Sequence, residues 1–169
     1  MARLLIVHHS PTRTLQALTE QVVAGARDPE IEGVGVEIRE ALDFARGNAG
    51  AEDLLAADGY LLGTSANFGS MSGALKHVFD STFLAIGGAL DATGAGDPDA
   101  AGTTKGRPFG LYVHGRYDTT GAVRSVLALT GALGWKQGYD VLEILGDPTP
   151  AEEASAYELG GTIAALLTV

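Results

Sequence analysis

Three short segments of the sequence gather side chains that suit a polar ligand, and the first, residues 8–14, reads His-His-Ser-Pro-Thr-Arg-Thr. Its hydroxyl groups and its arginine precede a helical pattern of apolar residues. The free amides and the dipole of a helix N-terminus attract anions. The sequence therefore predicts a phosphate-binding loop formed by Ser10, Thr12, Arg13 and Thr14. The alternative is a simple helix cap, with Thr14 as the capping residue.

Two adjacent histidines, His8 and His9, open this segment. Neighbouring residues of a strand point to opposite faces, so the pair would chelate a metal ion poorly. We therefore expect no metal site, and we interpret His8 as a buried, hydrogen-bonded side chain.

The second segment, residues 63–76, reads Gly-Thr-Ser-Ala-Asn-Phe-Gly-Ser-Met-Ser-Gly-Ala-Leu-Lys and connects a short buried strand to a helix. Small residues allow a ligand to approach the backbone closely. Phe68 and Met71 add apolar side chains beside free amide groups, and this combination suits a flat heteroaromatic ligand. The alternative is an ordinary strand-to-helix connection, with Ser72 as the N-cap and with Phe68 and Met71 packed in the core.

The third segment, residues 114–121, reads His-Gly-Arg-Tyr-Asp-Thr-Thr-Gly. His114 and Tyr117 could flank a flat ring, and Arg116 could attract the phosphate of a nicotinamide cofactor. In a simpler interpretation, Asp118 or the threonine after it caps the next helix. A general base at His114, oriented by Asp118, has no serine or cysteine nucleophile to act on.

The elements that must position these segments alternate between strand and helix patterns. We expect residues 42–50 to be irregular and residues 87–106 to form a long loop, either a functional flap or disordered. The repeated order of strand and helix predicts an open parallel α/β sheet with helices on both faces and a ligand crevice at the carboxyl ends of the strands. The expected strands are 3–8, 33–38, 60–64, 107–114 and 138–145, and the expected helices are 15–23, 51–57, 72–86, 119–133 and 149–167.

The composition excludes several kinds of protein. There is no cysteine, which excludes disulfides, thiolate catalysis and Cys-ligated metal sites. Eleven Lys and Arg against 21 Asp and Glu give a net charge of −10, without the basic patch that nucleic-acid binding requires. The sequence motifs of α/β-hydrolases, P-loop enzymes and Rossmann dehydrogenases do not follow the first expected strand.

A chain of 169 residues suits one domain. No apolar run approaches the ~20 residues that a membrane-spanning helix needs. The first expected strand begins at residue 3 and leaves no room for a signal peptide. We therefore expect a cytoplasmic protein without membrane insertion.

The second segment, together with Phe-Asp-Ser-Thr at residues 79–82, resembles the flavodoxin-like superfamily, closest to its NAD(P)H-dependent FMN reductase and quinone reductase branch. That family carries a Gly-(Thr/Ser)-Pro-x-(Tyr/Arg/Asn)-(Phe/Tyr)-Gly-x-Met-Ser-x-x-Leu-Lys run followed by Phe-x-Asp-x-Thr. Lys-Gly-Arg-Pro at residues 105–108 is similar to the family's approach to its fourth strand. The resemblance covers nearly the whole chain.

The resemblance implies one flavodoxin-like domain over residues 1–169, a three-layer sandwich whose five-stranded parallel sheet has the order 2-1-3-4-5. It also implies FMN at the strand ends, NADH or NADPH as electron donor, and no catalytic side chain of the protein's own. The first loop, Ser10 to Thr14, would hold the FMN phosphate. The flavin ring and ribityl chain would contact Thr64, Ser65, Ala66, Asn67, Phe68 and Gly69, and the ring's other edge would contact His114, Gly115, Arg116 and Asp118.

The sequence departs from the family pattern in two places. Its phosphate loop is one residue shorter than usual and lacks the family's glycine, and Ser65-Ala66 stands where the family has Thr/Ser-Pro.

Three functions stay open. The chain could be an FMN oxidoreductase that passes electrons to a quinone, a flavin or a similar small molecule, often as a dimer or tetramer. It could instead be an acidic flavodoxin-type carrier that docks on basic partners, or a flavodoxin fold that has lost FMN.

Overall fold

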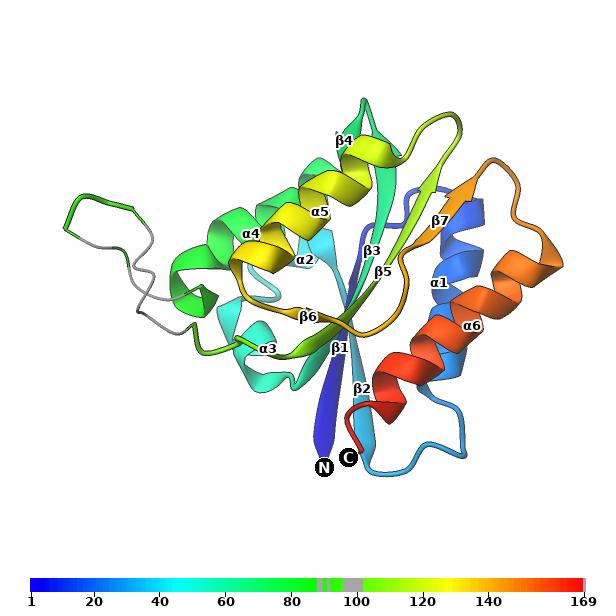
Figure 1. The fold of residues 1–169 in the computed structure, drawn as a ribbon, viewed down its shortest axis with the longest axis horizontal. Coiled ribbons are helices and arrows are strands. Elements are labelled where there is room, and N and C mark those ends of the chain that lie inside the picture. The colour runs from blue at the N-terminus through cyan, green and yellow to red at the C-terminus, as the bar shows by residue number, and fades with distance from the viewer. Residues whose placement is uncertain (88–89, 91, 96–101, 169) are drawn as a thin grey trace.

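The fold is an open, mostly parallel sheet between two layers of helices (Figure 1). The computed structural model describes residues 1–87, 90, 92–95 and 102–168. The strands pair in the order β2-β1-β3-β5-β6, with β7 also paired to β5 and β4 to β3, so the predicted order is confirmed. Their bounds are β1 (Ala2–His8), β2 (Val34–Glu40), β3 (Gly59–Asn67), β4 (Ser70–Met71), β5 (Pro108–Gly115), β6 (Lys136–Gln137) and β7 (Leu142–Leu145).

The prediction of one last strand over residues 138–145 is wrong in its extent. Two short strands take its place, and both pair in parallel with β5: Lys136 of β6 lies opposite Pro108, and Leu142 of β7 lies opposite Tyr112. Residues 138–141 leave the ladder between them. This stretch contains a glycine and an aspartate, which are poor strand formers.

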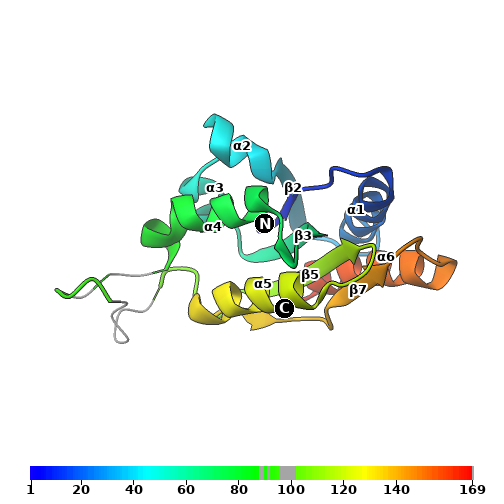
Figure 2. The ribbon, with the colours of Figure 1, turned by 90° about the horizontal axis from the view of Figure 1, so that it is seen from above.

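The helices cover both faces of the sheet. The bounds are α1 (Arg13–Ala26), α2 (Ala41–Arg46), α3 (Ala51–Ala56), α4 (Gly73–Ile86), α5 (Thr120–Ala132) and α6 (Pro150–Ala165). Figure 2 shows α1 and α6 on one side of the sheet and α4 and α5, with the short α2 and α3, on the other. Each side has its own apolar cluster. None of the helices among the described residues is long and apolar enough to span a membrane.

Residues 42–50 were predicted to be irregular, and that prediction is wrong for the first part. The helix α2 begins directly after β2, where the Asp43 carboxylate accepts a hydrogen bond from the Glu40 amide. Gly47, at φ +76°, ends it. Phe44 is buried against the core beside α4. Six residues are too short to show a helical period, so the sequence pattern missed this helix.

The centre of the sheet explains the unbroken apolar run near the N-terminus. Residues 4–7 of β1 are buried on both faces, as a central parallel strand requires. On one face, α1 and α6 cross with almost no side chain between them. A Cβ on Gly160 of α6 would lie 2.0 Å from the Val22 carbonyl oxygen of α1. Glycine is therefore required where these helices cross.

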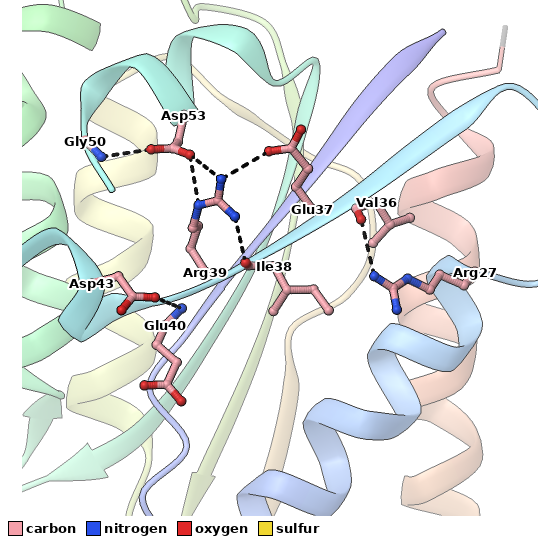
Figure 3. A network of polar contacts seen from close by, with 9 residues as sticks. All are labelled: Arg27, Val36, Glu37, Ile38, Arg39, Glu40, Asp43, Gly50 and Asp53. Carbon is pink, nitrogen blue, oxygen red and sulfur yellow. Dashed lines mark hydrogen bonds and ion pairs between the residues drawn. The ribbon is translucent and has the colours of Figure 1, made fainter. Parts of the chain in front are cut away.

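The edge strand β2 is fixed to α3 by an ion pair (Figure 3). Arg39 donates from Nε and Nη2 to one oxygen of Asp53, at 2.9 Å each, and from Nη1 to the Ile38 carbonyl at 3.2 Å. The second oxygen of Asp53 accepts from the Gly50 amide at 2.8 Å. Arg39 thus covers an edge carbonyl of β2 and holds the start of α3 against the strand.

Part of the predicted 87–106 loop, residues 88–89, 91 and 96–101, lies outside the described residues, so the flap prediction stays untested. The two ends of this segment meet at Thr104. Its hydroxyl donates to the Ile86 carbonyl at 3.2 Å and accepts from Trp135 Nε1 at 2.9 Å. The indole ring of Trp135 stacks on Tyr60 with ring centroids 3.9 Å apart. The return of the chain into β5 is therefore anchored in the core.

Candidate functional site

The three predicted segments meet at the carboxyl edge of the sheet, at the top of Figure 1. The register places His8 of β1 beside Gly63 of β3, and Ser65 of β3 beside His114 of β5. Strand order reverses between β1 and β3, since β2 lies on the far side of β1 and β5 on the far side of β3. Ligands of open α/β sheets bind at such a reversal.

The first loop presents an open helix N-terminus. Thr12 is the N-cap, because its hydroxyl accepts from the Leu15 amide at 3.2 Å, so the prediction of Thr14 as the cap is wrong. The amides of Arg13 and Thr14 have no acceptor within the described part of the chain. The Arg13 side chain is exposed. This end of α1 can therefore bind an anion through backbone amides and one guanidinium group.

Ser10 lies differently from the other hydroxyls of this loop. Its Oγ bonds to His8 Nδ1 at 3.0 Å and to Thr19 Oγ1 at 2.8 Å, so its side chain is turned toward the protein. His8 is hydrogen-bonded, as predicted, but it is half-buried and not fully buried. Burial lowers the pKa of its imidazole, opposed by the carboxylate of Glu40. Ser10 is thus part of a hydrogen-bond network within the protein.

The second segment forms a hairpin, which was not predicted, because the third strand was expected to end at residue 64. The strand β3 continues to Asn67, which pairs with Ser70 of β4. Phe68 and Gly69 form the turn, both at positive φ, +49° and +79°. Met71 is buried, as one interpretation expected, but Phe68 is fully exposed at the tip, so its placement in the core is wrong.

The hairpin is held firmly on both sides. The Thr64 hydroxyl donates to the Ser65 carbonyl at 2.9 Å and accepts from the Ser72 amide at 3.0 Å, so Thr64 joins β3 to the start of α4. Ser72 is the N-cap of α4, as predicted. On the other side, a Cβ on Gly121 of α5 would lie 1.9 Å from the Gly69 carbonyl oxygen. The tip that carries Phe68 is therefore fixed against α5.

The third segment is mostly engaged in contacts within the protein. His114 Nε2 donates to the Gly146 carbonyl at 2.7 Å, so this nitrogen is unavailable as a general base. Arg116 lies 3.7 Å from the Asp147 carboxylate, and both are exposed. Asp118 accepts from the Thr120 amide, the first of α5, at 2.9 Å, and this bond lowers the pKa of Asp118. Thr119 holds the N-cap position but makes no side-chain cap bond, so of the two predicted caps Asp118 supplies the side-chain contact.

Two uncharged residues of this segment, Gly115 and Tyr117, differ in their exposure. Gly115 packs closely, since a Cβ there would lie 3.0 Å from the Thr119 methyl group and 3.2 Å from the Cβ of Ala66. Tyr117 is 91% exposed. Within the described residues, the third segment therefore offers the exposed ring of Tyr117, while Gly115 is buried and the charged groups already have partners.

Two buried polar atoms at this edge lack partners. Within the described residues, His9 Nδ1 and Ser65 Oγ are the buried side-chain polar atoms without a hydrogen bond. They follow β1 and lie in β3, on either side of the reversal in strand order. Buried polar groups in folded proteins are normally paired, and an unpaired one costs about 1–3 kcal/mol. These two unpaired atoms therefore fit a ligand that offers them hydrogen bonds, such as FMN, between the two strand ends.

Three contributing residues escaped the sequence analysis: Thr19, Tyr112 and Glu143. Thr19 lies among the apolar positions of α1, which was the available signal, and it bonds Tyr112 at 2.9 Å across 93 residues of sequence. Glu143 of β7 accepts from the Thr119 hydroxyl at 2.7 Å. These partners come from distant elements, and no local motif indicates them.

Comparison with known proteins gives the fold. No family model matches the chain. A flavodoxin from Aquifex aeolicus (strain VF5) is 30% identical over 91 residues, which make up 54% of this chain and 45% of that flavodoxin, so the match spans less than half of the relative's length.

Solved structures match over nearly the full chain. An archaeal flavodoxin has a TM-score of 0.73 at 17% identity and covers 99% of both chains. A WrbA-like flavodoxin from Agrobacterium tumefaciens has a TM-score of 0.69 at 17% identity and covers 99% of this chain and 98% of its own. A flavodiiron core from Synechocystis has a TM-score of 0.71 at 15% identity and covers 99% of this chain and 36% of its own. The chain therefore has the flavodoxin-like fold.

Proposed function

We propose that this chain binds FMN at the carboxyl edge of the sheet and transfers electrons through it. The observation that carries the proposal is the pair of unpartnered buried atoms, Ser65 Oγ and His9 Nδ1, on either side of the reversal in strand order. The open N-terminus of α1 lies at the same edge and suits the phosphate. Similarity to flavodoxins in sequence and in fold supports the choice of FMN over other phosphate-bearing ligands.

In this proposal each part of the edge has one task. The amides of Arg13 and Thr14, with the Arg13 guanidinium, hold the phosphate. Ser65 and the hairpin backbone bind the polar edge of the flavin, and Phe68 and Tyr117 offer flat apolar surfaces. The bound flavin supplies the redox chemistry, since it accepts a hydride and gives up electrons singly or in pairs.

We further propose that the protein is an NAD(P)H-dependent oxidoreductase with a quinone, a flavin or a similar small molecule as acceptor. The exposure of Phe68 and Tyr117 favours this function, because these side chains pack on no part of the described structure and leave room for a second flat molecule. The net charge of −10 supports the alternative of a carrier that docks on basic partners. Oxidation of NADH or NADPH by the FMN-loaded protein, with a quinone present, separates the two functions.

Replacement of Ser65 by alanine tests the cofactor site. Because Ser65 Oγ has no partner in the described part of the chain, Ser65→Ala should raise the free energy of unfolding of the FMN-free protein by about 1 kcal/mol. The same change should weaken FMN binding about tenfold, because it removes a polar contact. The readouts are urea unfolding, followed by Trp135 fluorescence, and FMN titration.

The control is Ser70→Ala, an exposed serine on β4 of the same hairpin, which should change neither quantity. A Ser65→Ala protein that is less stable and binds FMN as well as the wild type would contradict the proposed site. It would assign a structural role to Ser65 instead.

A further inference from the structure

A chain of four hydrogen-bonded side chains runs from the core to the first loop. Tyr112 OH lies 2.9 Å from Thr19 Oγ1, which lies 2.8 Å from Ser10 Oγ, which lies 3.0 Å from His8 Nδ1. Tyr112 reaches Thr19 because residue 63 is glycine. A Cβ on Gly63 would lie 2.2 Å from the phenol oxygen. The chain therefore depends on a specific gap in β3.

Tyr112 sets the direction of these hydrogen bonds. Its side chain is buried, and burial raises the pKa of the phenol, so the phenol keeps its hydrogen and needs an acceptor. Thr19 Oγ1 is its partner in the structure. The Thr19 hydroxyl then donates to Ser10, and Ser10 donates to Nδ1 of neutral His8. A neutral imidazole that accepts at Nδ1 carries its hydrogen on Nε2.

We propose that His8 is a positioning residue that decides whether the Ser10 hydroxyl can donate to an anion bound at the start of α1. Neutral His8 accepts the Ser10 hydrogen and holds it inside the protein. Protonated His8 can only donate at Nδ1, so the Ser10 hydrogen must turn to another acceptor. A phosphate in the first loop supplies that acceptor. An anion in this loop therefore binds more tightly when His8 is protonated.

The charged groups around His8 help to set the pH at which its imidazole gains a proton. The groups that face it, or line the groove of about 570 Å³ beside it, come from β2, α2, α1 and the first loop: Glu40, Asp43, Glu20, Arg27 and His9. The carboxylates favour protonation, whereas burial and His9 oppose it. Burial is the largest of these effects, so the pKa of His8 lies on the acidic side of the ordinary histidine value.

The inference rests on the proposed FMN site, and its test is FMN affinity as a function of pH, from about 5.5 to about 8. The wild type is compared with His8→Asn, whose amide oxygen can accept from Ser10 but cannot titrate, and with Ser10→Ala. The phosphate's own ionisation affects all three proteins alike and cancels in their ratio. At each pH, the FMN affinity of the wild type is divided by that of His8→Asn, and this ratio should fall about tenfold as the pH rises. The ratio of the wild-type affinity to that of Ser10→Ala should fall by a similar factor.

Two further measurements test whether the pH dependence acts through the phosphate and through Ser10. Riboflavin, which lacks the phosphate, should show no such dependence. In nitrogen NMR spectra of the FMN-free protein, neutral His8 should carry its hydrogen on Nε2, and inorganic phosphate should raise the pKa of His8 in the wild type but not in Ser10→Ala.

Parallel pH profiles for the wild type and His8→Asn would overturn the inference and leave the FMN site standing. A riboflavin profile that matches the FMN profile would overturn it too, because the effect would not act through the phosphate. Absence of FMN binding at every pH would overturn the proposed function as well as this inference.

Discussion

Phe68 adopts φ +49°, a region that residues with a Cβ enter at a cost, and its side chain is fully exposed at the tip of a fixed hairpin. Replacement by asparagine, which tolerates this backbone conformation, should raise the free energy of unfolding by about 0.5–1 kcal/mol. If Phe68 contacts the flavin or a second flat molecule, Phe68→Asn should also weaken FMN binding or raise the KM for the acceptor. Urea unfolding and steady-state kinetics measure the two effects. A variant that is more stable and equally active would exclude a functional role for Phe68.

Arg13 is the exposed cation in the first turn of α1. Replacement by alanine should weaken FMN binding about fivefold, since a charge-assisted contact to the phosphate is lost, and should leave riboflavin binding unchanged. Lys105→Ala removes the same charge at the opposite end of the sheet, before β5, and is the matched control. Equal loss of FMN affinity in both variants would show that only the overall charge matters.

The candidate site was only partly predictable from the sequence. The three segments were found because residues after parallel strands share one edge of the sheet, and that rule needs only the order of elements. The role of each side chain depends on partners far along the chain. Ser10 was assigned to the phosphate, yet it bonds Thr19 and His8, and Thr64 was assigned to the flavin, yet it caps the turn into α4. No spacing within a segment indicates such bonds.

At the scale of elements, the crossing of α1 and α6 gives the sharpest prediction. Gly160→Ala places a methyl group 2.0 Å from the Val22 carbonyl oxygen, so the helices must separate. The free energy of unfolding should fall by about 2–3 kcal/mol, as overpacking against backbone predicts. Among the described residues, none lies within 4 Å of the Cβ position of Gly131 in α5, so Gly131→Ala should instead raise stability by about 0.5–1 kcal/mol. Equal effects of the two changes in chemical denaturation would refute this account of the crossing.

The elements themselves were predictable where local signals are strong. The apolar run of β1 is typical of a central strand, and Pro150 and Glu152 in the first turn are typical of a helix start, where the structure has the capping box of α6. The signals failed where elements are short. The helix α2 and the β3–β4 hairpin span too few residues for a period, and the hairpin turn has Phe68 in a place where Asn or Gly is the usual signal.

At the scale of the whole molecule, we propose that residues 1–169 fold as one unit whose stability falls on acidification. Burial lowers the pKa of His8 below its value in the unfolded chain, so the unfolded chain binds a proton first as the pH falls below about 7. Hydrogen bonds lower the pKa of Asp28, Asp118 and Glu152, so their contributions are present above the unfolded pKa and are lost as the pH falls through the lower folded pKa.

Urea unfolding of the FMN-free protein at a series of pH values checks this prediction. Trp135 fluorescence and far-UV circular dichroism should give one coincident transition at each pH. His8→Asn should remove the decline near neutral pH and keep the decline at acidic pH. Two separate transitions would contradict the single unit, and an unchanged pH profile in His8→Asn would contradict the role given to His8. Assembly into dimers or tetramers stays a prediction, which sedimentation of the same samples tests.

The most direct test of the central claim is a titration of the purified wild-type chain with FMN and, in parallel, with riboflavin, followed by flavin fluorescence and absorption. The proposed site predicts FMN binding in the micromolar range, roughly −8 kcal/mol, and riboflavin binding at least about tenfold weaker, because the α1 N-terminus contributes only through the phosphate. Equal affinities would place the flavin away from the first loop. Absence of FMN binding at about 1 mM would contradict the cofactor assignment and leave a flavodoxin-like fold that works without flavin.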